Sequence, residues 1–471
     1  MDAPRLHVAS VEVFERLMPF VRPFRFGPSV VEAAPQAFVR VTVEVEGAGA
    51  ATGASAEMMM PKWFDKTPQK SPGDTVDDLR RGLVNAAGLY AHAAGETAFA
   101  LSAAARPAQL AWAQREGVPP LAAGFGPALL DKAVLDGLLS ALGLGFMGGL
   151  KRNVMGLDAR LAPDLAPGQV DAFLAGLSAA PAVALRHTVG LLDPLDGPHG
   201  LATEIAAANL SFFKIKIGGD VPADMDRLAE IAAILAAHAP GFAATLDANE
   251  QYDPDRLEQL YAALGTPALA PFKARLLYVE QPFDRRETFA APLAPALAGL
   301  PIIVDEADDA YESFVRASAL GYRGVSSKAC KGLYKSLLNA ARVKGWNANG
   351  PRAPFLISAE DLTCQAGLAI EQDTALVAAL GLTHGERNGH HYVDGFGPAP
   401  DTEAHAFAQA HPLLYAVRDG RVALDVSRGL IPTQSLLSAP GFARRAEPEW
   451  ASLDPIPLTP VTDPTLQETP A

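Results

Sequence analysis

Two lysines in the stretch Phe212-Phe213-Lys214-Ile215-Lys216-Ile217-Gly218-Gly219 are the first residues whose types and spacing indicate chemistry. The run predicts a buried strand, in which the two lysines share one face and the isoleucines share the other. Because an unpaired buried charge is costly, the two ammonium groups are expected to face carboxylates or to lose a proton.

Carboxylates that could pair with these lysines occur downstream, at the ends of further strand-like runs. They are Asp247, Glu280 and Asp305, and another lysine, Lys328, ends the run Gly324-Val325-Ser326-Ser327. The intervals between successive strand ends (216, 247, 280, 305 and 328) are 31, 33, 25 and 23 residues, and each fits one strand plus one helix. We therefore expect these side chains to meet at one edge of a parallel sheet.

The elements that position these residues are predicted to form a (β/α)8-type, TIM-like barrel. Amphipathic segments such as 222–237 lie between the strands and repeat apolar residues at helical spacing. Polar residues at the carboxyl ends of barrel strands indicate an active site. The predicted strands are 184–191, 213–217, 243–246, 276–279, 301–304, 324–327, 354–357 and 380–383.

The rest of the chain is predicted to form an α+β capping domain. Residues 6–17, 37–46 and 49–57 alternate apolar and polar side chains, and 75–142 has helical spacing. We divide the chain into an N-terminal capping part (1–150), a barrel (181–395) and a C-terminal segment (396–471) that returns to the cap and ends in a loose tail. Two apolar loops, 23–28 and 58–64, are expected to pack on the neighbouring domain, to cover a ligand, or both.

The chemistry expected at the barrel mouth is proton abstraction beside a carboxylate. Three carboxylates without cysteine or a paired histidine form a hard oxygen site, which suits Mg²⁺. A divalent ion and the ammonium of Lys214 should disfavour protonated Lys216 and leave it able to act as a base. The metal would hold the substrate carboxylate and stabilise the enediolate formed when the α-proton leaves.

The order Lys-x-Lys, Asp-x-Asn, Glu-Gln-Pro, Asp-Glu and Ser-x-Lys-x-x-Lys resembles the enolase superfamily, most closely its muconate-lactonizing and dipeptide-epimerase branch. The resemblance covers most of the chain, and it implies a racemase or epimerase with one Mg²⁺. It implies metal ligation by Asp247, Glu280 and Asp305, acid/base roles for Lys216 and Lys328, and a place beside the substrate carboxylate for Lys214. The residues expected to bind substrate are Phe24, Met58, Trp63, Asn249, Ser358 and Glu386.

The sequence departs from the family pattern at three places. Gly332-Leu333 replaces a glycine pair after the sixth-strand lysine. Asp305-Glu306-Ala307 leaves open whether Asp305 or Glu306 faces the metal. Ser358-Ala359-Glu360-Asp361 follows the seventh strand, where a histidine would mark the mandelate-racemase branch, and the histidines His384, His390 and His391 come later.

Composition narrows the class of partner. The net charge of −14 over 471 residues argues against a nucleic-acid partner, and two cysteines, Cys330 and Cys364, offer no disulfide framework. The start lacks a signal pattern and no long apolar run occurs, so we expect a cytoplasmic protein without a membrane partner, acting on a small carboxylate as a homo-oligomer. The alternatives are a cycloisomerase or dehydratase, an aldolase with a lysine Schiff base, and a non-catalytic barrel relative.

Overall fold

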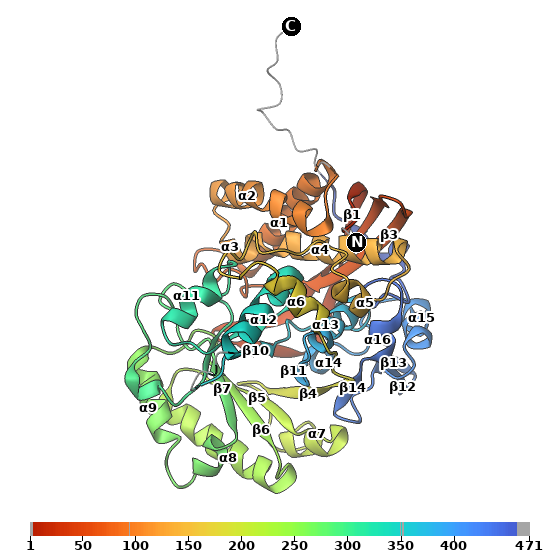
Figure 1. Cartoon of the computed structure of the whole chain (residues 1–471). Coiled ribbons are helices and arrows are strands. Elements are labelled where there is room, and N and C mark those ends of the chain that lie inside the picture. The colour runs from red at the N-terminus through yellow and green to blue at the C-terminus, as the bar shows by residue number, and fades with distance from the viewer. Residues whose placement is uncertain (1–2, 94, 349, 351–352, 459–471) are drawn as a thin grey trace.

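The computed structural model describes residues 3–93, 95–348, 350 and 353–458. An antiparallel sheet with its helices lies above a parallel barrel in Figure 1. The predicted loose tail beyond residue 458 lies outside the described residues. Within them, no helix is both long and apolar enough to cross a membrane.

The capping sheet has the strand order β15-β1-β2-β3. Its strands are β1 (Leu6–Phe26), β2 (Ser29–Val45), β3 (Gly49–Met58) and β15 (Asp454–Pro455), and all of their pairings are antiparallel. The pairing of β15 with β1 brings the C-terminal segment back to the N-terminal sheet. The cap helices are α1 (Pro72–Ala91), α2 (Ala98–Glu116), α3 (Pro120–Ala123) and α4 (Phe125–Ala141).

Helix α4 packs closely on strand β3. A Cβ atom at Gly53 would lie 2.0 Å from the carbonyl oxygen of Ala133, so only glycine permits this approach. The Asp136 carboxylate on α4 accepts hydrogen bonds from the backbone N–H groups of Ala54 (2.8 Å) and Phe442 (2.7 Å). One helix thus holds both the sheet and the C-terminal segment.

The barrel has eight parallel strands, as predicted, in the order β10-β9-β8-β7-β6-β5-β4-β11. Strands β10 and β11, at the two ends of this path, lie next to each other, so the barrel is nearly closed. A further strand, β14 (Leu430–Pro432), pairs antiparallel with β4. The barrel strands are β4 (Ala182–Val189), β5 (Phe212–Lys216), β6 (Ala243–Asp247), β7 (Leu276–Glu280), β8 (Ile302–Val304), β9 (Gly324–Ser327), β10 (Leu356–Ala359) and β11 (His384–Glu386).

The barrel helices alternate with these strands, and their apolar faces form one core with the barrel wall. They are α7 (Leu201–Ala208), α8 (Val221–His238), α9 (Pro254–Ala263), α10 (Ala270–Lys273), α11 (Ser313–Ala319), α12 (Leu333–Ala348), α13 (Leu368–Ala379) and α14 (Gly389–Tyr392). Connecting elements are α5 (Phe146–Lys151), α6 (Gln169–Ala175), α15 (Asp401–Ala410), β12 (Tyr415–Arg418), β13 (Arg421–Leu424), α16 (Gln434–Ser438) and the 3-10 turns Pro295–Leu297, Ala329–Lys331 and Trp450–Ser452.

Three predicted barrel strands are displaced in the structure, and the first runs over 182–189 rather than 184–191. The eighth begins at His384 rather than Leu380, because α13 runs to Ala379 and Gly381 (φ +75°) ends it. The seventh runs over 356–359 rather than 354–357. The shifts of the seventh and eighth strands matter for function, since they place Glu360 and Glu386 at the carboxyl ends of these strands.

Candidate active site at the barrel mouth

Lys214, on β5, lies at the centre of a buried group of carboxylates. Its Nζ is 2.9 Å from Asp247 Oδ2, 2.9 Å from Glu280 Oε2, 2.8 Å from Glu360 Oε2 and 2.9 Å from Glu386 Oε2. The four acids stand at or just beyond the ends of β6, β7, β10 and β11. The lysines on β5 were expected to face carboxylates, and the Lys214 ammonium does contact four of them.

Lys216 lies at the end of the same strand and faces the same side. Its Nζ donates to Asp247 Oδ2 (2.6 Å) and to Asn249 Oδ1 (2.8 Å). Asn249 has a left-handed backbone (φ +41°), and its amide donates to Glu306 Oε1 (3.1 Å). A non-glycine residue held in this conformation stores local strain, which is common at functional sites.

Asp305 is enclosed by groups on β9 and just after it. Its Oδ2 is 2.6 Å from Lys328 Nζ and its Oδ1 is 3.2 Å from Lys331 Nζ, and the Ser326 hydroxyl also donates to Oδ1. The neighbouring Glu306 is also buried, but it faces Asn249 and lies 3.6 Å from Lys66 Nζ. The two adjacent carboxylates therefore serve different partners.

Arg186 and Glu360 complete the charge network, and sequence reasoning missed both. Arg186 on β4 donates to the Glu360 carboxylate and to the Ala359 carbonyl (2.7 Å). Tyr278 Oη also donates to Glu360 Oε1 (2.8 Å). Glu360 could have been found as the acidic residue that directly follows the seventh strand. The predicted strand ended at residue 357 instead of 359, so Glu360 was not recognised as a strand-end residue.

Burial and neighbouring charges shift the pKa of several groups in opposite directions. Burial lowers the pKa of Lys214, but the four surrounding carboxylates outweigh it and the net pKa is raised well above its usual value. Burial and the charges of Asp247 and Glu360 raise the pKa of Glu280 well above normal. Burial opposes ionisation of Asp305, yet Lys328 and Lys331 hold its pKa well below normal. The electrostatic potential of the network is therefore most negative around Glu280, where the ionised carboxylate is disfavoured.

The donor set fits a hard divalent cation, although ammonium groups hold it in this structure. Asp247, Glu280 and Asp305 offer only oxygen ligands, which Mg²⁺ prefers. Lys214 Nζ lies between the first two, and Lys328 and Lys331 hold the third. The mutual repulsion that raises the pKa of Glu280 is the condition that a bound cation relieves.

A small cavity at the barrel mouth exposes the two predicted acid/base lysines to the same space. The cavity has an empty volume of about 310 Å³ and lies beneath the cap. Lys216 enters from β5 and Lys328 from just beyond β9. The lining residues are Phe24, Phe26, Met60, Trp63, Lys214, Lys216, Asn249, Lys328, Asp361, Leu362, Thr363, Glu386 and Asn388.

Two cap segments cover this cavity. The predicted loop 23–28 is instead the tip of a hairpin, because β1 continues to Phe26 and the chain turns at Gly27 (φ +49°) into β2. Phe24 packs on Tyr392, with ring centroids 4.4 Å apart. After β3, the Trp63 ring lies over Lys328, whose Nζ is 4.4 Å from the ring centroid. The cap thus contacts the catalytic candidates directly.

The second covering segment is anchored to the barrel by charged groups. Lys66 pairs with Glu250, and its Nζ donates to the Asn249 carbonyl (2.9 Å). Arg285 donates to the carbonyl oxygens of Trp63 and Phe64, both at 3.0 Å. These contacts support both readings of the loop, since it packs on the barrel and also lines the cavity.

Two predicted substrate-binding residues lie away from this space. Among the described residues that line the cavity, Met58 and Ser358 are absent. Met58 is the last residue of β3 and is fully buried, while Met60 takes its place at the cavity. Ser358 lies within β10 rather than after it, so the lining begins at Asp361. Phe24, Trp63, Asn249 and Glu386 do line it.

The histidines near the eighth strand lie outside the cavity lining among the described residues. His384 Nδ1 lies 3.1 Å from Arg186 Nη1, and the His384 ring stacks on Phe212. His390 and His391 are on α14 and pack against each other, with ring centroids 3.9 Å apart. Their surroundings differ from those of the barrel-mouth acids.

The barrel and its cap have the same fold as a solved member of the enolase superfamily from Roseovarius nubinhibens, with a TM-score of 0.57 at 18% identity, covering 96% of this chain and 99% of that chain. No protein-family profile matches the sequence, and no curated protein matches it. Solved structures do match over almost the whole chain, which establishes the fold.

Three of these structures illustrate the likeness. A dipeptide epimerase from Cytophaga hutchinsonii, complexed with Mg and the dipeptide D-Ala-L-Val, has a TM-score of 0.61 at 13% identity and covers 95% of this chain and 99% of its own. An enolase from Bradyrhizobium, complexed with magnesium and mandelic acid, has a TM-score of 0.60 at 17% identity, covering 95% and 97%. A muconate lactonizing enzyme from Pseudomonas fluorescens, complexed with muconolactone, has a TM-score of 0.58 at 17% identity, covering 94% and 97%.

Proposed function

We propose that this protein is a Mg²⁺-dependent enzyme that removes the proton α to a substrate carboxylate through an enediolate, acting as a racemase or epimerase. The observation that carries the proposal is that Lys216 and Lys328 reach one cavity from β5 and from beyond β9, four strands apart in the barrel. Two bases that flank a planar intermediate can each serve one enantiomer. Solved structures of the same fold include a dipeptide epimerase.

Asp247, Glu280 and Asp305 are the proposed Mg²⁺ ligands. When bound there, Mg²⁺ would supply positive charge to hold the substrate carboxylate. Lys214 would have to withdraw from Asp247 and Glu280, and it would keep Glu360 and Glu386 as partners. Adding Mg²⁺ to chelator-treated protein should raise the thermal unfolding temperature, and an unchanged temperature would contradict this assignment.

Lys328 is the group best placed to return a proton. Burial lowers its pKa, but Asp305 outweighs burial and the net pKa is raised, so the side chain is an ammonium at neutral pH. To act as the base for the other enantiomer, Lys328 would have to lose this proton, and a cation that draws Asp305 away from it would favour that loss. Lys216, held by Asp247 and Asn249, is the proposed opposite base.

The cavity lining suggests which residues contact substrate. Asn249 and Glu386 offer polar groups, and Phe24 and Trp63 offer an apolar cover. The small carboxylate substrate is expected to lie between them. Trp63→Ala should change which carboxylic acids the enzyme prefers as substrates, while Mg²⁺ affinity stays unchanged. If the substrate preference does not change, the segment around Trp63 serves only to pack the cap on the barrel.

The decisive experiment measures α-proton exchange in D₂O. A library of acyl-amino acids, dipeptides, sugar acids and cyclic acids identifies an active carboxylate. Lys216→Ala should then lose exchange from one enantiomer and Lys328→Ala from the other, with racemisation lost in both. Lys151→Ala, at an exposed lysine on α5, is the matched control.

Other outcomes have defined meanings. If only one lysine is needed for exchange, the protein is a cycloisomerase or dehydratase, and the second lysine stabilises the intermediate. If neither substitution affects exchange, the proposed mechanism is wrong. If no acid exchanges although Mg²⁺ binds, a non-catalytic barrel is the better description.

Two further proposals concern the protein in the cell. We propose a homo-oligomer, supported by the exposed Leu17, Val21 and Val30 on β1 and β2, which are 59%, 66% and 53% accessible. We also propose a cytoplasmic location. Light scattering of the purified chain measures the oligomeric state, and a monomer at micromolar concentration would contradict the first proposal.

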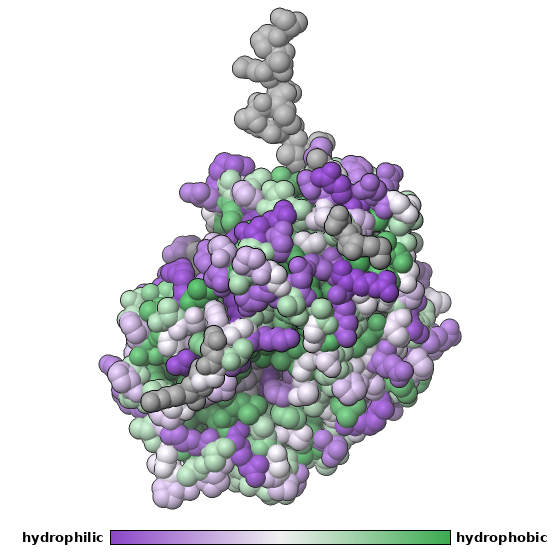
Figure 2. All heavy atoms as spheres, in the orientation of Figure 1, coloured by the Kyte–Doolittle hydropathy of each residue, from purple (hydrophilic) through white to green (hydrophobic). Residues whose placement is uncertain are grey.

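Figure 2 shows how the surface of one face is distributed between polar and apolar side chains. Hydrophilic residues are spread over it among smaller hydrophobic areas.

A further inference from the structure

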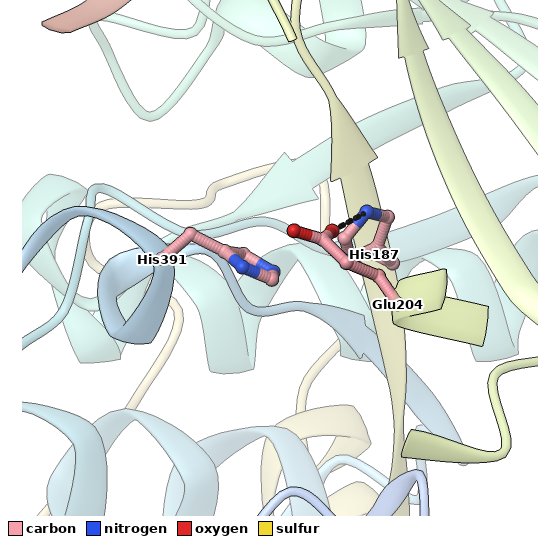
Figure 3. Close-up of side chains that lie close together, drawn as sticks. All are labelled: His187, Glu204 and His391. Carbon is pink, nitrogen blue, oxygen red and sulfur yellow. Dashed lines mark ion pairs between the residues drawn. The ribbon is translucent and has the colours of Figure 1, made fainter. Parts of the chain in front are cut away.

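A second group of ligand-type side chains lies on the outer wall of the barrel. His187 comes from β4, Glu204 from α7 and His391 from α14. Figure 3 shows their side chains directed toward one another, with the ion pair between His187 and Glu204. Residues 187, 204 and 391 are far apart in the sequence, so only the fold brings them together.

The geometry of this group is close to that of a metal site. His187 Nε2 is 2.9 Å from Glu204 Oε2, and the rings of His187 and His391 are 4.6 Å apart and nearly perpendicular. One ligand atom from each of the three residues lies within 4.8 Å of the others. His187 is buried, and Glu204 and His391 are partly buried.

An independent observation points to a ligand. His391 Nε2 is buried and makes no hydrogen bond within the described part of the chain, and the same is true of Nδ1 on the adjacent His390. A buried polar atom without a partner is unfavourable, and a bound ion is one way to satisfy it. Arg22 Nη1 lies 3.7 Å from Glu204 Oε1, so the other carboxylate oxygen faces His187.

We propose that His187, Glu204 and His391 bind a Zn²⁺-type transition-metal ion at a site separate from the barrel mouth. Two imidazoles and one carboxylate are a common ligand set for Zn²⁺, whereas Mg²⁺ prefers oxygen ligands alone. Ligand distances of about 2.0–2.2 Å place tetrahedral ligand atoms about 3.3 Å apart. The distance of 2.9 Å between His187 Nε2 and Glu204 Oε2 must therefore increase slightly on metal binding, and the longest distance between ligand atoms must decrease. Rotation of the side chains can provide both changes.

Such a site would connect the barrel wall to the cover of the cavity. His391 precedes Tyr392, whose ring packs on Phe24 at the hairpin tip. Asn388, three residues before His391, lines the barrel-mouth cavity. An ion that holds α14 to β4 and α7 would fix both contacts.

The test is calorimetric titration of the chelator-treated full chain with Zn²⁺ in saturating Mg²⁺. We expect one Zn²⁺ per chain, and at least about tenfold weaker binding in each of His187→Gln, Glu204→Gln and His391→Gln. His238→Gln, at an exposed histidine ending α8, should bind as the wild type does. Asp247→Asn, at the mouth, should also leave Zn²⁺ affinity unchanged.

Circular dichroism establishes that each variant is folded. If His187→Gln does not fold, Glu204→Gln, at a partly exposed helix position, still tests the site. Titration with Co²⁺ adds a visible spectrum that reports imidazole coordination. Absence of Zn²⁺ binding, or binding that none of the three substitutions weakens, would overturn the proposal.

Discussion

Arg186 and His187 are neighbours on β4, but their side chains lie on opposite faces of the barrel wall. Arg186 points inward to Glu360 and the carboxylate-lysine network, and His187 points outward to Glu204 on α7. The inner face is a set of oxygen acids neutralised by ammonium and guanidinium groups. The outer face is a small group of imidazoles with one acid.

Because successive side chains of a strand point to opposite faces, β4 contributes a guanidinium to the inner charge network and an imidazole to the outer group. The inner charges compensate one another, so removing one partner leaves buried charge unpaired. The outer group contains fewer charges and is partly exposed at Glu204, so its substitutions should be milder. Four predictions measure that contrast.

The largest effect is expected for Lys214→Met. Removing the ammonium leaves four buried carboxylates without their shared partner, so the free energy of unfolding should fall by about 3–5 kcal/mol. Mg²⁺ should restore part of it if Asp247 and Glu280 bind the ion. Urea unfolding with and without Mg²⁺ measures both effects, with Lys151→Met as control; a loss below about 1 kcal/mol would contradict the central role of Lys214.

Arg186→Met should have the next largest effect, about 3 kcal/mol. Glu360 loses its guanidinium partner but keeps Lys214 and the Tyr278 hydroxyl, both at 2.8 Å. Urea unfolding measures the loss. Arg160→Met, which breaks an exposed pair with Asp158, should change stability by less than about 1 kcal/mol and serves as the control.

A pH dependence should arise at His384, which contacts Arg186. Burial and the Arg186 charge lower the pKa of His384 to about 3, against a usual value near 6.5. The folded protein therefore keeps this imidazole neutral, and its stabilising contribution, present above about pH 6.5, is lost as the pH falls. Between pH 7 and pH 5 the loss should be about 2 kcal/mol.

His384→Asn removes this titration while keeping an oxygen that can accept from Arg186. The difference between the wild type and the variant in urea unfolding at pH 7 and pH 5 isolates the contribution of His384. Equal pH dependence in both proteins would show that the imidazole is protonated without penalty in the folded state.

The barrel and the acidic residues at its mouth could be predicted from the sequence, but the contacts between the side chains of these residues could not. Asp247, Glu280 and Asp305 lie at the ends of apolar runs that are each one strand-helix unit apart. This spacing can be read from the sequence alone. Glu360 was missed because the seventh strand was placed two residues early. The ammonium of Lys214 between four acids could not be predicted, because it depends on side-chain positions from five strands.

The outer histidine group was beyond sequence reasoning for another reason. No sequence motif links His187, Glu204 and His391. Glu204 lies on α7, and the rotation of that helix about its axis determines where the Glu204 side chain points. His390 and His391 are adjacent near the eighth strand, and nothing in the sequence around them indicates contact with His187 or Glu204. Local patterns identify which face of a strand a residue occupies, but not which distant residue meets it there.

The smallest effect is expected for His187→Gln in metal-free protein. The substitution loses the ion pair with Glu204 and the packing against His391, so stability should fall by about 1 kcal/mol. Its consequence should become clear with metals, because Zn²⁺ should stabilise the wild type and not this variant. Mg²⁺, acting at the inner face, should stabilise both to the same extent. Thermal unfolding in each ion measures the contrast, and equal stabilisation of both proteins by Zn²⁺ would show that His187 does not hold a metal site on the outer wall.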